Sequence, residues 1–241
     1  MEQAGTAGTA ASRPEGVPLA LIADWLSPLA GRRVLDVGCG GGALARDLAA
    51  LGARVSGVDP LAEAVAAARV LVPEGAFMEA GAEALPFADG AFDAAVLLNS
   101  FHHVPPALMS AALDEAMRVT RGPVLVVEPL AEGPFFEVMR PVEDETDIRR
   151  AAQAVIAGHV TQGRARLVRA HEFDDVRRFA DVDAFLAKVV AVDPARAEAA
   201  RALRGEVEAL MARWGRPEGA AIRLDQPHRA VLLARPEGDR P

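Results

Sequence analysis

The sequence predicts an α/β fold in which a doubly wound, mostly parallel sheet carries helices on both faces. Short apolar segments alternate with helical segments through the first half of the chain, which is the order that a parallel sheet with crossover helices requires. Residues 94–98 are apolar at every position, as expected for a strand that is buried on both faces. A glycine-rich turn follows the first apolar segment, where such folds hold their ligands.

The length and composition fit one large domain. A chain of 241 residues, 51% of them hydrophobic, can bury a substantial core, and it contains no apolar run of membrane-spanning length. The net charge of −8 argues against a broad surface for nucleic acid. Cys39 is the only cysteine, which excludes an internal disulfide and a multi-cysteine metal site and makes a reducing cytoplasm the expected compartment.

The elements of the first half follow from their patterns. Residues 19–29 place apolar side chains at helical spacing, and Ser27-Pro28 ends or bends that helix. The strands are short apolar runs, most of them closed by an acid or a polar residue. Gly52 and Gly122-Pro123 close the helices that precede them. We therefore expect strands at 33–37, 54–59, 76–80, 94–98 and 124–127, and helices at 43–51, 62–70 and 108–119.

The second half is less regular. An acidic run at 143–147 opens a helix, where the helix dipole favours negative charge, so we interpret the run as structural. The remaining patterns predict a strand at 165–171, a link at 172–179, helices at 182–191 and 194–214, and a hairpin of 221–224 with 229–234.

The domain organisation follows from these elements. Residues 1–18 are rich in small residues and lack the apolar core of a signal peptide, so we expect a mobile tail. We expect a single domain over 19–235, with an insertion at about 133–163 that covers the substrate, and a second tail at 236–241.

The segment Val34–Ala43 is the most informative local motif. The glycines allow a sharp turn and a close backbone approach, and the following helix directs free N–H groups toward the same point. Gly38-x-Gly40-x-x-Ala43 fits a loose dinucleotide pattern, with Asp59 at the distance expected for ribose hydroxyls. Asp36 is not part of that pattern. A carboxylate at this strand end suits a ligand that carries a cation, and S-adenosylmethionine carries both an ammonium and a sulfonium.

This motif resembles the first motif of the class I S-adenosylmethionine-dependent methyltransferases. Residues 81–93 (GAEALPFADGAFD) strengthen the resemblance, because they are similar to the segment between the third and fourth strands of the group that includes the ubiquinone and menaquinone methylating enzymes. The resemblance covers about residues 32–129. It implies a Rossmann-like methyltransferase fold with a seven-stranded sheet in the order 3-2-1-4-5-7-6, whose last strand is antiparallel. It also implies S-adenosylmethionine as the methyl donor.

The resemblance assigns donor-binding roles to particular residues. Asp36 and three glycines of the turn would hold the methionine portion, Asp59 the ribose, and Asn99 the amino-acid end. Gly81 stands where the family often has an acid that contacts the adenine, so other side chains must take that edge. The implied donor-binding residues are Asp36, Gly38, Gly40, Gly42, Asp59, Leu61, Ala82, Glu83 and Asn99.

The acceptor side is predicted from strand ends. His102 and His103 follow the fourth strand and Glu128 closes the fifth, so all three are candidate catalytic residues, with His103 or Glu128 as the base that removes an acceptor proton. Glu128 is equally well interpreted as a solvated or helix-paired acid. Neighbouring histidines point apart on a regular helix or strand, so we expect no metal site. His159, His171 and His228 are candidates by residue type alone.

Other functions stay open at this point. A nicotinamide-dependent oxidoreductase fits the loose glycine pattern, but Asp36 and residues 82–92 count against it. A non-methylating enzyme that uses S-adenosylmethionine for cyclisation or alkyl transfer would share the donor pocket, and a binding protein without catalysis is a third alternative. The acidic chain favours a small-molecule acceptor over nucleic acid. The sequence leaves the acceptor, the methylated atom and the oligomeric state open.

Overall fold

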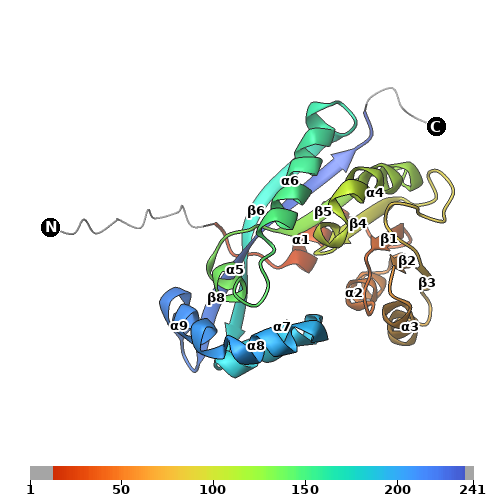
Figure 1. The fold of residues 1–241 in the computed structure, drawn as a ribbon. Helices are drawn as coiled ribbons and strands as arrows, with labels where there is room; N and C mark the ends of the chain where they lie inside the picture. The colour runs from red at the N-terminus through yellow and green to blue at the C-terminus, as the bar shows by residue number, and fades with distance from the viewer. Residues whose placement is uncertain (1–12, 237–241) are drawn as a thin grey trace.

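The computed structural model describes residues 13–236 and contains one mixed sheet (Figure 1). The strands run in the order β3-β2-β1-β4-β5-β8-β6, and the short β7 pairs with β8 outside this path. Neighbours from β3 to β5 are parallel, whereas β8 is antiparallel to both β5 and β6. The predicted order is therefore confirmed. The strands are β1 Arg33–Val37, β2 Arg54–Asp59, β3 Ala76–Glu79, β4 Ala94–Leu98, β5 Val124–Pro129, β6 Arg166–Phe179, β7 Arg216–Glu218 and β8 Ala221–Ala234.

Helices cover both faces of the sheet. Alternate residues of β1 face opposite layers: Val34 packs with one buried cluster, and Leu35 and Val37 pack with the other. Among the helices of residues 13–236, none is long and apolar enough to cross a bilayer. The first layer contains α1 Pro18–Trp25, α2 Ala43–Ala50 and α3 Ala62–Leu71, and the second contains α4 Pro106–Val119 and α6 Thr146–Thr161.

A third cluster lies at one end of the sheet, where β6 and β8 extend beyond the parallel strands (Figure 1). We call it the cap. Its core contains Phe135, Phe179 and Phe185, whose ring centroids lie 5.2–6.1 Å apart. The helices of the cap are α5 Pro134–Met139, α7 Val182–Val192, η2 Pro194–Arg196, α8 Ala197–Ala202 and α9 Arg204–Trp214.

The insertion expected at 133–163 divides between two layers. Helix α5 belongs to the cap, whereas Ala152 and Ile156 of α6 pack into the main core beside α4. Most of the cap comes instead from residues 182–214. The expected long helix at 194–214 is broken at Leu203, which ends α8 and precedes α9.

Two strand predictions in the second half are wrong. Strand β6 continues to Phe179 where a link was expected, and β8 runs through residues 225–228 where a hairpin loop was expected. The two strands pair with each other from Arg166 to Phe179, so each satisfies the backbone groups of the other along its whole length. The hairpin in this region joins β7 to β8 instead.

The expected N-terminal tail is only partly testable, because residues 1–12 lie outside the described residues, as do 237–241. Residues 13–17 do not form a free tail. Asp174 of β6 exchanges backbone hydrogen bonds with Pro14 and Gly16, and Arg13 donates to Glu172 at 2.9 Å. The segment therefore runs along the sheet edge and covers part of it.

Candidate active site

The glycine turn after β1 has the backbone geometry that its sequence predicts. Gly38, Gly40 and Gly42 have φ angles of 75°, 49° and 86°, a region that side chains with a Cβ rarely adopt. A Cβ at position 38 would lie 2.4 Å from Ser100 Cβ, so glycine is also required there by packing. The Gly38 N–H donates to Val58 O at 2.8 Å, which fastens the turn to the end of β2.

Gly40 faces open space. A Cβ built on it would meet nothing within 4 Å, in contrast to the crowded Gly38. Its N–H donates to Asp59 Oδ2 at 2.9 Å, while Asp59 Oδ1 accepts from Leu61 N at 3.0 Å. Each carboxylate oxygen can accept a further hydrogen bond. Asp59 therefore fixes the turn and retains capacity for a ligand, and Leu61 beside it is 65% exposed.

Asp36 is a buried carboxylate with an unsatisfied oxygen. It is 2% exposed, and its Oδ2 has no hydrogen-bond partner. Burial, with a further contribution from the nearby Asp59 carboxylate, raises the pKa of Asp36 to about 7. A buried acceptor without a partner is costly, so this oxygen is suited to a donor or cation supplied by a ligand.

Glu83 occupies the space next to Gly81. A Cβ at position 81 would lie 2.4 Å and 2.5 Å from the two Glu83 carboxylate oxygens. The acid that is missing at position 81 is thus replaced in space by an acid from two residues further along the chain. Ala82 packs against the main core.

The end of β4 joins the glycine turn to the acceptor side. Ser100 Oγ donates to Val37 O at 2.6 Å, so the chain after β4 is bound to the end of β1. Asn99 has a φ of 52°, an uncommon conformation that asparagine tolerates better than most residues. Its carboxamide lies 2.9 Å from Nε2 of His228, a fully buried residue of β8.

The neighbouring strand end holds Glu128, which is 1% exposed. Its Oε1 accepts from the N–H groups of Ser100 and Phe101 at 3.0 Å and 2.9 Å, and its Oε2 accepts from the His102 N–H and also contacts His102 Nδ1. The helix-paired interpretation of Glu128 is therefore nearer to the structure than the solvated one. Its side chain is used to hold the short helix η1 (Phe101–His103) and to orient the His102 ring.

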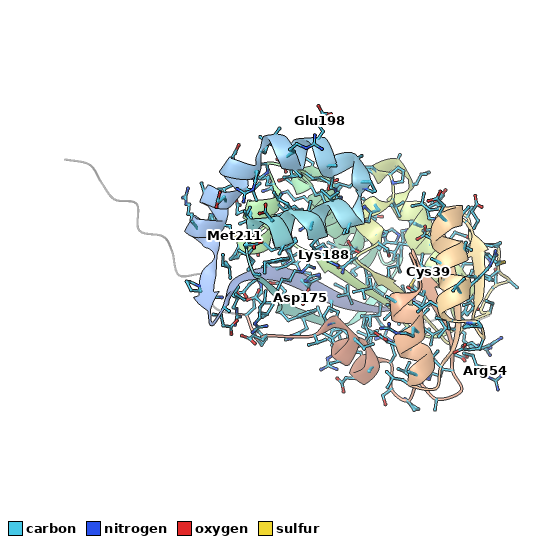
Figure 2. All side chains as sticks on the ribbon, turned by 90° about the horizontal axis from the view of Figure 1, so that it is seen from below. Cys39, Arg54, Asp175, Lys188, Glu198 and Met211 are labelled. Atoms are coloured by element: carbon cyan, nitrogen blue, oxygen red, sulfur yellow. The ribbon has the colours of Figure 1, made fainter. Side chains whose placement is uncertain are left out.

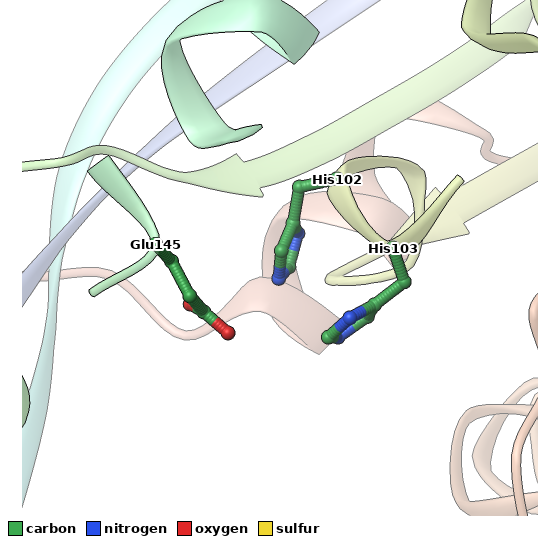
Figure 3. Close-up of side chains that lie close together, drawn as sticks. All are labelled: His102, His103 and Glu145. Atoms are coloured by element: carbon green, nitrogen blue, oxygen red, sulfur yellow. The ribbon is translucent and has the colours of Figure 1, made fainter. Parts of the chain in front are cut away.

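The two histidines of η1 do not point apart. Their ring centroids lie 4.1 Å apart with an interplanar angle of 38°, and the Glu145 side chain approaches both (Figure 3). The prediction considered a regular helix or strand, whereas His102 and His103 lie in the single short turn η1, where their side chains bring the two rings into contact. The side chain of His103 is exposed to solvent. Partial desolvation by the surrounding protein, followed by the nearby His102, nevertheless lowers the pKa of His103.

Glu145 begins the helix α6 and is buried. Arg149, one turn later, donates to Glu145 Oε2 from Nε at 2.8 Å, and its second terminal nitrogen lies 2.6 Å from the same oxygen. Burial opposes ionisation of Glu145, but Arg149 and the two histidines hold its pKa below the usual value. The acidic run is therefore not wholly structural, since Glu145 points toward the histidines while Asp144 caps Thr146.

These side chains form one wall of a cavity of about 760 Å³ between the parallel sheet and the cap. The sheet side contributes Asn99, His102 and His103. The cap side contributes mainly apolar residues together with cations, including Lys188 of α7, the only lysine in the chain (Figure 2). The cap residues that line it are Phe135, Met139, Phe179, Ala184, Lys188, Val189, Val192 and Arg196.

The other histidines lie outside this cavity. His159 is 2% exposed and ties α6 to α4 through Asp114, at 3.3 Å. His171 stacks on Phe173 within β6, with ring centroids 6.2 Å apart. His228 reaches the site only through Asn99, and burial lowers its pKa to about 4, so it is neutral near pH 7.

Comparison with known proteins agrees with this geometry. Residues 34–122, which contain the glycine turn, Asp59 and the histidines, match the family described as "Methyltransferase domain". Over these residues the chain is similar to that family. This confirms the resemblance seen in the sequence, and the match ends before β5 and the cap.

Relatives and solved structures extend the comparison beyond residues 34–122. A demethylmenaquinone methyltransferase of Beutenbergia cavernae is 38% identical over 135 residues, 55% of each chain. The YcgJ protein of Bacillus subtilis has a TM-score of 0.64 at 20% identity, covering 91% of this chain and 98% of that one. A methyltransferase of Geobacter sulfurreducens in complex with S-adenosyl-L-homocysteine has a TM-score of 0.57 at 17% identity, covering 94% of both chains. The solved structures establish the fold, and the chain spans about half the length of the curated relatives it matches.

Sequence reasoning missed Glu145 and Arg149 as site residues, and it named His228 by residue type alone, without its contact to Asn99. The spacing of Glu145 and Arg149, one helical turn apart at the start of an amphipathic helix, was a visible signal for an ion pair. No sequence signal placed His228 beside Asn99, because that proximity depends on the register of β8 against β5.

Proposed function

We propose that this protein is an S-adenosylmethionine-dependent methyltransferase that acts on a small-molecule acceptor. The observation that carries the proposal is the buried Asp36 carboxylate beside the glycine turn, with one oxygen that has no partner. A dinucleotide would bring phosphates to this turn, and a buried carboxylate would repel them. The ammonium and sulfonium of S-adenosylmethionine would instead be attracted.

The residues around the turn fit the donor. Gly38, Gly40 and Gly42 allow close backbone approach to its methionine portion, and Asp59 can accept hydrogen bonds from ribose hydroxyls. Exposed Leu61 offers an apolar surface to the adenine, and Ala82 and Glu83 lie at its edge. Asn99 supports the amino-acid end from the neighbouring strand.

The chemistry demands positioning more than activation. When bound, the donor supplies a methyl group on cationic sulfur; the acceptor lone pair forms the new bond while the carbon–sulfur bond breaks and its electron pair stays on sulfur. The cavity and its cap hold the acceptor at near-attack distance and exclude water. His103 and His102 line the cavity; His103 is the base that takes the single proton released by the acceptor, and Glu128 is a positioning residue that orients His102.

The cavity favours a moderately hydrophobic small molecule as acceptor. Its cap wall is aromatic and aliphatic, which suits a ring system. The matched portion of the demethylmenaquinone methyltransferase supports a quinone-like acceptor as the first class to test. The charge of −8 weighs against nucleic acid, and the single cysteine supports the cytoplasm as the compartment.

The donor is tested by calorimetric titration of the purified protein with S-adenosylhomocysteine, with NADH in parallel. We expect micromolar binding of the first and none of the second. Asp59→Asn should weaken binding by more than about tenfold, since a charge-assisted hydrogen bond is lost. Asp24→Asn, on the exposed face of α1, is the matched control. If NADH binds and S-adenosylhomocysteine does not, the proposal of methyl transfer is wrong and hydride transfer becomes the proposed reaction.

The acceptor-side assignment is tested with two histidine variants in a methyl-transfer assay on hydroxylated quinones. We expect His103→Asn to lower kcat by roughly a hundredfold with unchanged affinity for S-adenosylhomocysteine. His171→Asn removes an imidazole outside the cavity and should leave kcat unchanged. If both variants are equally active, the acceptor proton leaves by another path.

A further inference from the structure

The side chains of His102, His103 and Glu145 converge on one point of the cavity wall (Figure 3). One ligand atom from each lies within 4.8 Å of the others. They come from two elements far apart in the sequence, η1 and the start of α6. Two imidazoles and one carboxylate are a donor set that zinc and similar ions use in proteins.

Supporting contacts leave one atom of each buried side chain available. His102 Nδ1 contacts the Glu128 carboxylate, so its Nε2 is the nitrogen left for the cavity. A carboxylate behind a histidine in this way fixes the ring and strengthens it as a metal ligand. Arg149 binds Oε2 of Glu145, so Oε1 is the oxygen left to bind a metal ion.

The charges around the cluster are mixed. The carboxylates of Glu128, Glu143 and Glu145 lie near it with the guanidinium groups of Arg149 and Arg196, and the same cavity is also lined by Arg177, Arg178 and Lys188. Arg196 pairs with Glu143 and lies 3.7 Å from Glu145 Oε1, so it is the protein's own competitor for that oxygen. Neutral imidazoles add no positive charge.

We propose that His102 Nε2, a ring nitrogen of His103 and Glu145 Oε1 bind a divalent transition-metal ion such as Zn²⁺, with a coordination position open to the cavity. Zinc bonds of about 2.0–2.1 Å place tetrahedral ligand atoms roughly 3.4 Å apart, so the cluster must contract on binding. His103 can supply that movement, because it is exposed whereas His102 and Glu145 are held by Glu128 and Arg149.

A bound metal ion would change how the acceptor loses its proton. A proton and a metal ion compete for the same imidazole lone pair, so the base role given to His103 above belongs to the metal-free protein. In the metal-loaded protein, an acceptor hydroxyl at the open position would lose its proton to the buffer, because the cation stabilises the oxyanion. Metal binding itself does not depend on the proposed methyl transfer.

The test begins with the full chain, freed of metal with a chelator. It is titrated with Co²⁺ followed by visible absorption, and with Zn²⁺ followed by calorimetry. We expect a single bound ion, the intense d–d bands of a low-coordinate nitrogen–oxygen site, and displacement of Co²⁺ by Zn²⁺. Mg²⁺ should not displace it, because Mg²⁺ prefers oxygen ligands in an octahedral arrangement.

Variants separate a built site from chance binding. His103→Asn and Glu145→Gln should each weaken Co²⁺ binding by more than about tenfold. His171→Asn should bind Co²⁺ as the wild type does, since it removes an imidazole of β6 outside the cluster. Titration with S-adenosylhomocysteine checks the fold and the donor site of each variant independently. Absence of Co²⁺ binding in the wild type, or equal binding by His103→Asn and His171→Asn, would overturn the site.

Discussion

Asp36 shows how a functional residue can oppose the stability of the protein that contains it. Its carboxyl pKa is raised to about 7 in the fold, against about 3.9 in an unfolded chain. The fold therefore favours the protonated form. The contribution of Asp36 to stability is fully present below pH 4, is lost as the pH rises from about 4 to about 7, and stays lost above. A cationic ligand would recover part of this loss.

The first prediction is that Asp36→Asn stabilises the ligand-free protein at pH 8 and abolishes binding of S-adenosylhomocysteine. The amide keeps the shape but cannot ionise, so the gain in unfolding free energy should be on the order of 2–4 kcal/mol at pH 8. It should shrink toward zero near pH 4, because the wild-type carboxyl is then protonated as well. Urea unfolding at both pH values measures this. Equal gains at the two pH values would mean that ionisation of Asp36 is not the cause.

Single residues also mark what the sequence could and could not reveal. The positions of Asp36 and Asp59 near the ends of their strands were predictable, because both strands are recognisable apolar runs. The contacts of Arg149 with Leu130 and of His228 with Asn99 were not, because they join residues 19 and 129 positions apart in the chain. Glu83 is an intermediate case. The sequence identified it as a candidate, but its position beside Gly81 depends on the backbone conformation of the loop, which the sequence did not give.

At the scale of elements, the glycine turn and the chain after β4 form one unit. Ser100 is bound to Val37 O through its hydroxyl, and its Cβ fills the place where a side chain at Gly38 would stand. The turn therefore fixes the start of the acceptor side as well as the donor side. A substitution at Gly38 should disturb both, whereas Gly31 has the same φ and open space around it.

The second prediction compares Gly38→Ala with Gly31→Ala. The φ values are 75° and 76°, so both variants carry the same backbone cost of about 1–2 kcal/mol. Gly38→Ala adds the clash with Ser100, worth roughly 1–3 kcal/mol more. Urea unfolding of the two variants gives the difference directly. If they are equally destabilised, Ser100 moves aside without cost and does not lock the turn.

A helix or strand was predictable from the sequence where its own apolar pattern was clear. Strands β1 to β5 are short, apolar and separated by helices, so sequence and structure agree closely there. Strands β6 and β8 were misjudged because their central residues are polar and include Pro227. They are held extended by their pairing with each other, which is a tertiary effect that local patterns do not contain.

At the scale of the molecule, two bodies meet at the cavity. The parallel sheet and its two helical layers hold the glycine turn, and the cap is carried on the extended ends of β6 and β8 (Figure 1). The cap has its own apolar core around Phe185, which is fully buried. Because that core is small and separate, the cap should open more readily than the sheet.

The third prediction follows from this division and uses hydrogen exchange with and without S-adenosylhomocysteine. Backbone amides of α7–α9 should exchange faster than those of β1, β4 and β5, and the ligand should slow exchange mainly at the glycine turn. Phe185→Ala should speed exchange in the cap, because it leaves a cavity worth about 3–5 kcal/mol there, while affinity for S-adenosylhomocysteine changes little. Leu97→Ala, in the core beside the β4 end, is the control expected to affect the sheet and ligand binding together. Uniform acceleration across sheet and cap in Phe185→Ala would instead show that the two bodies unfold as one.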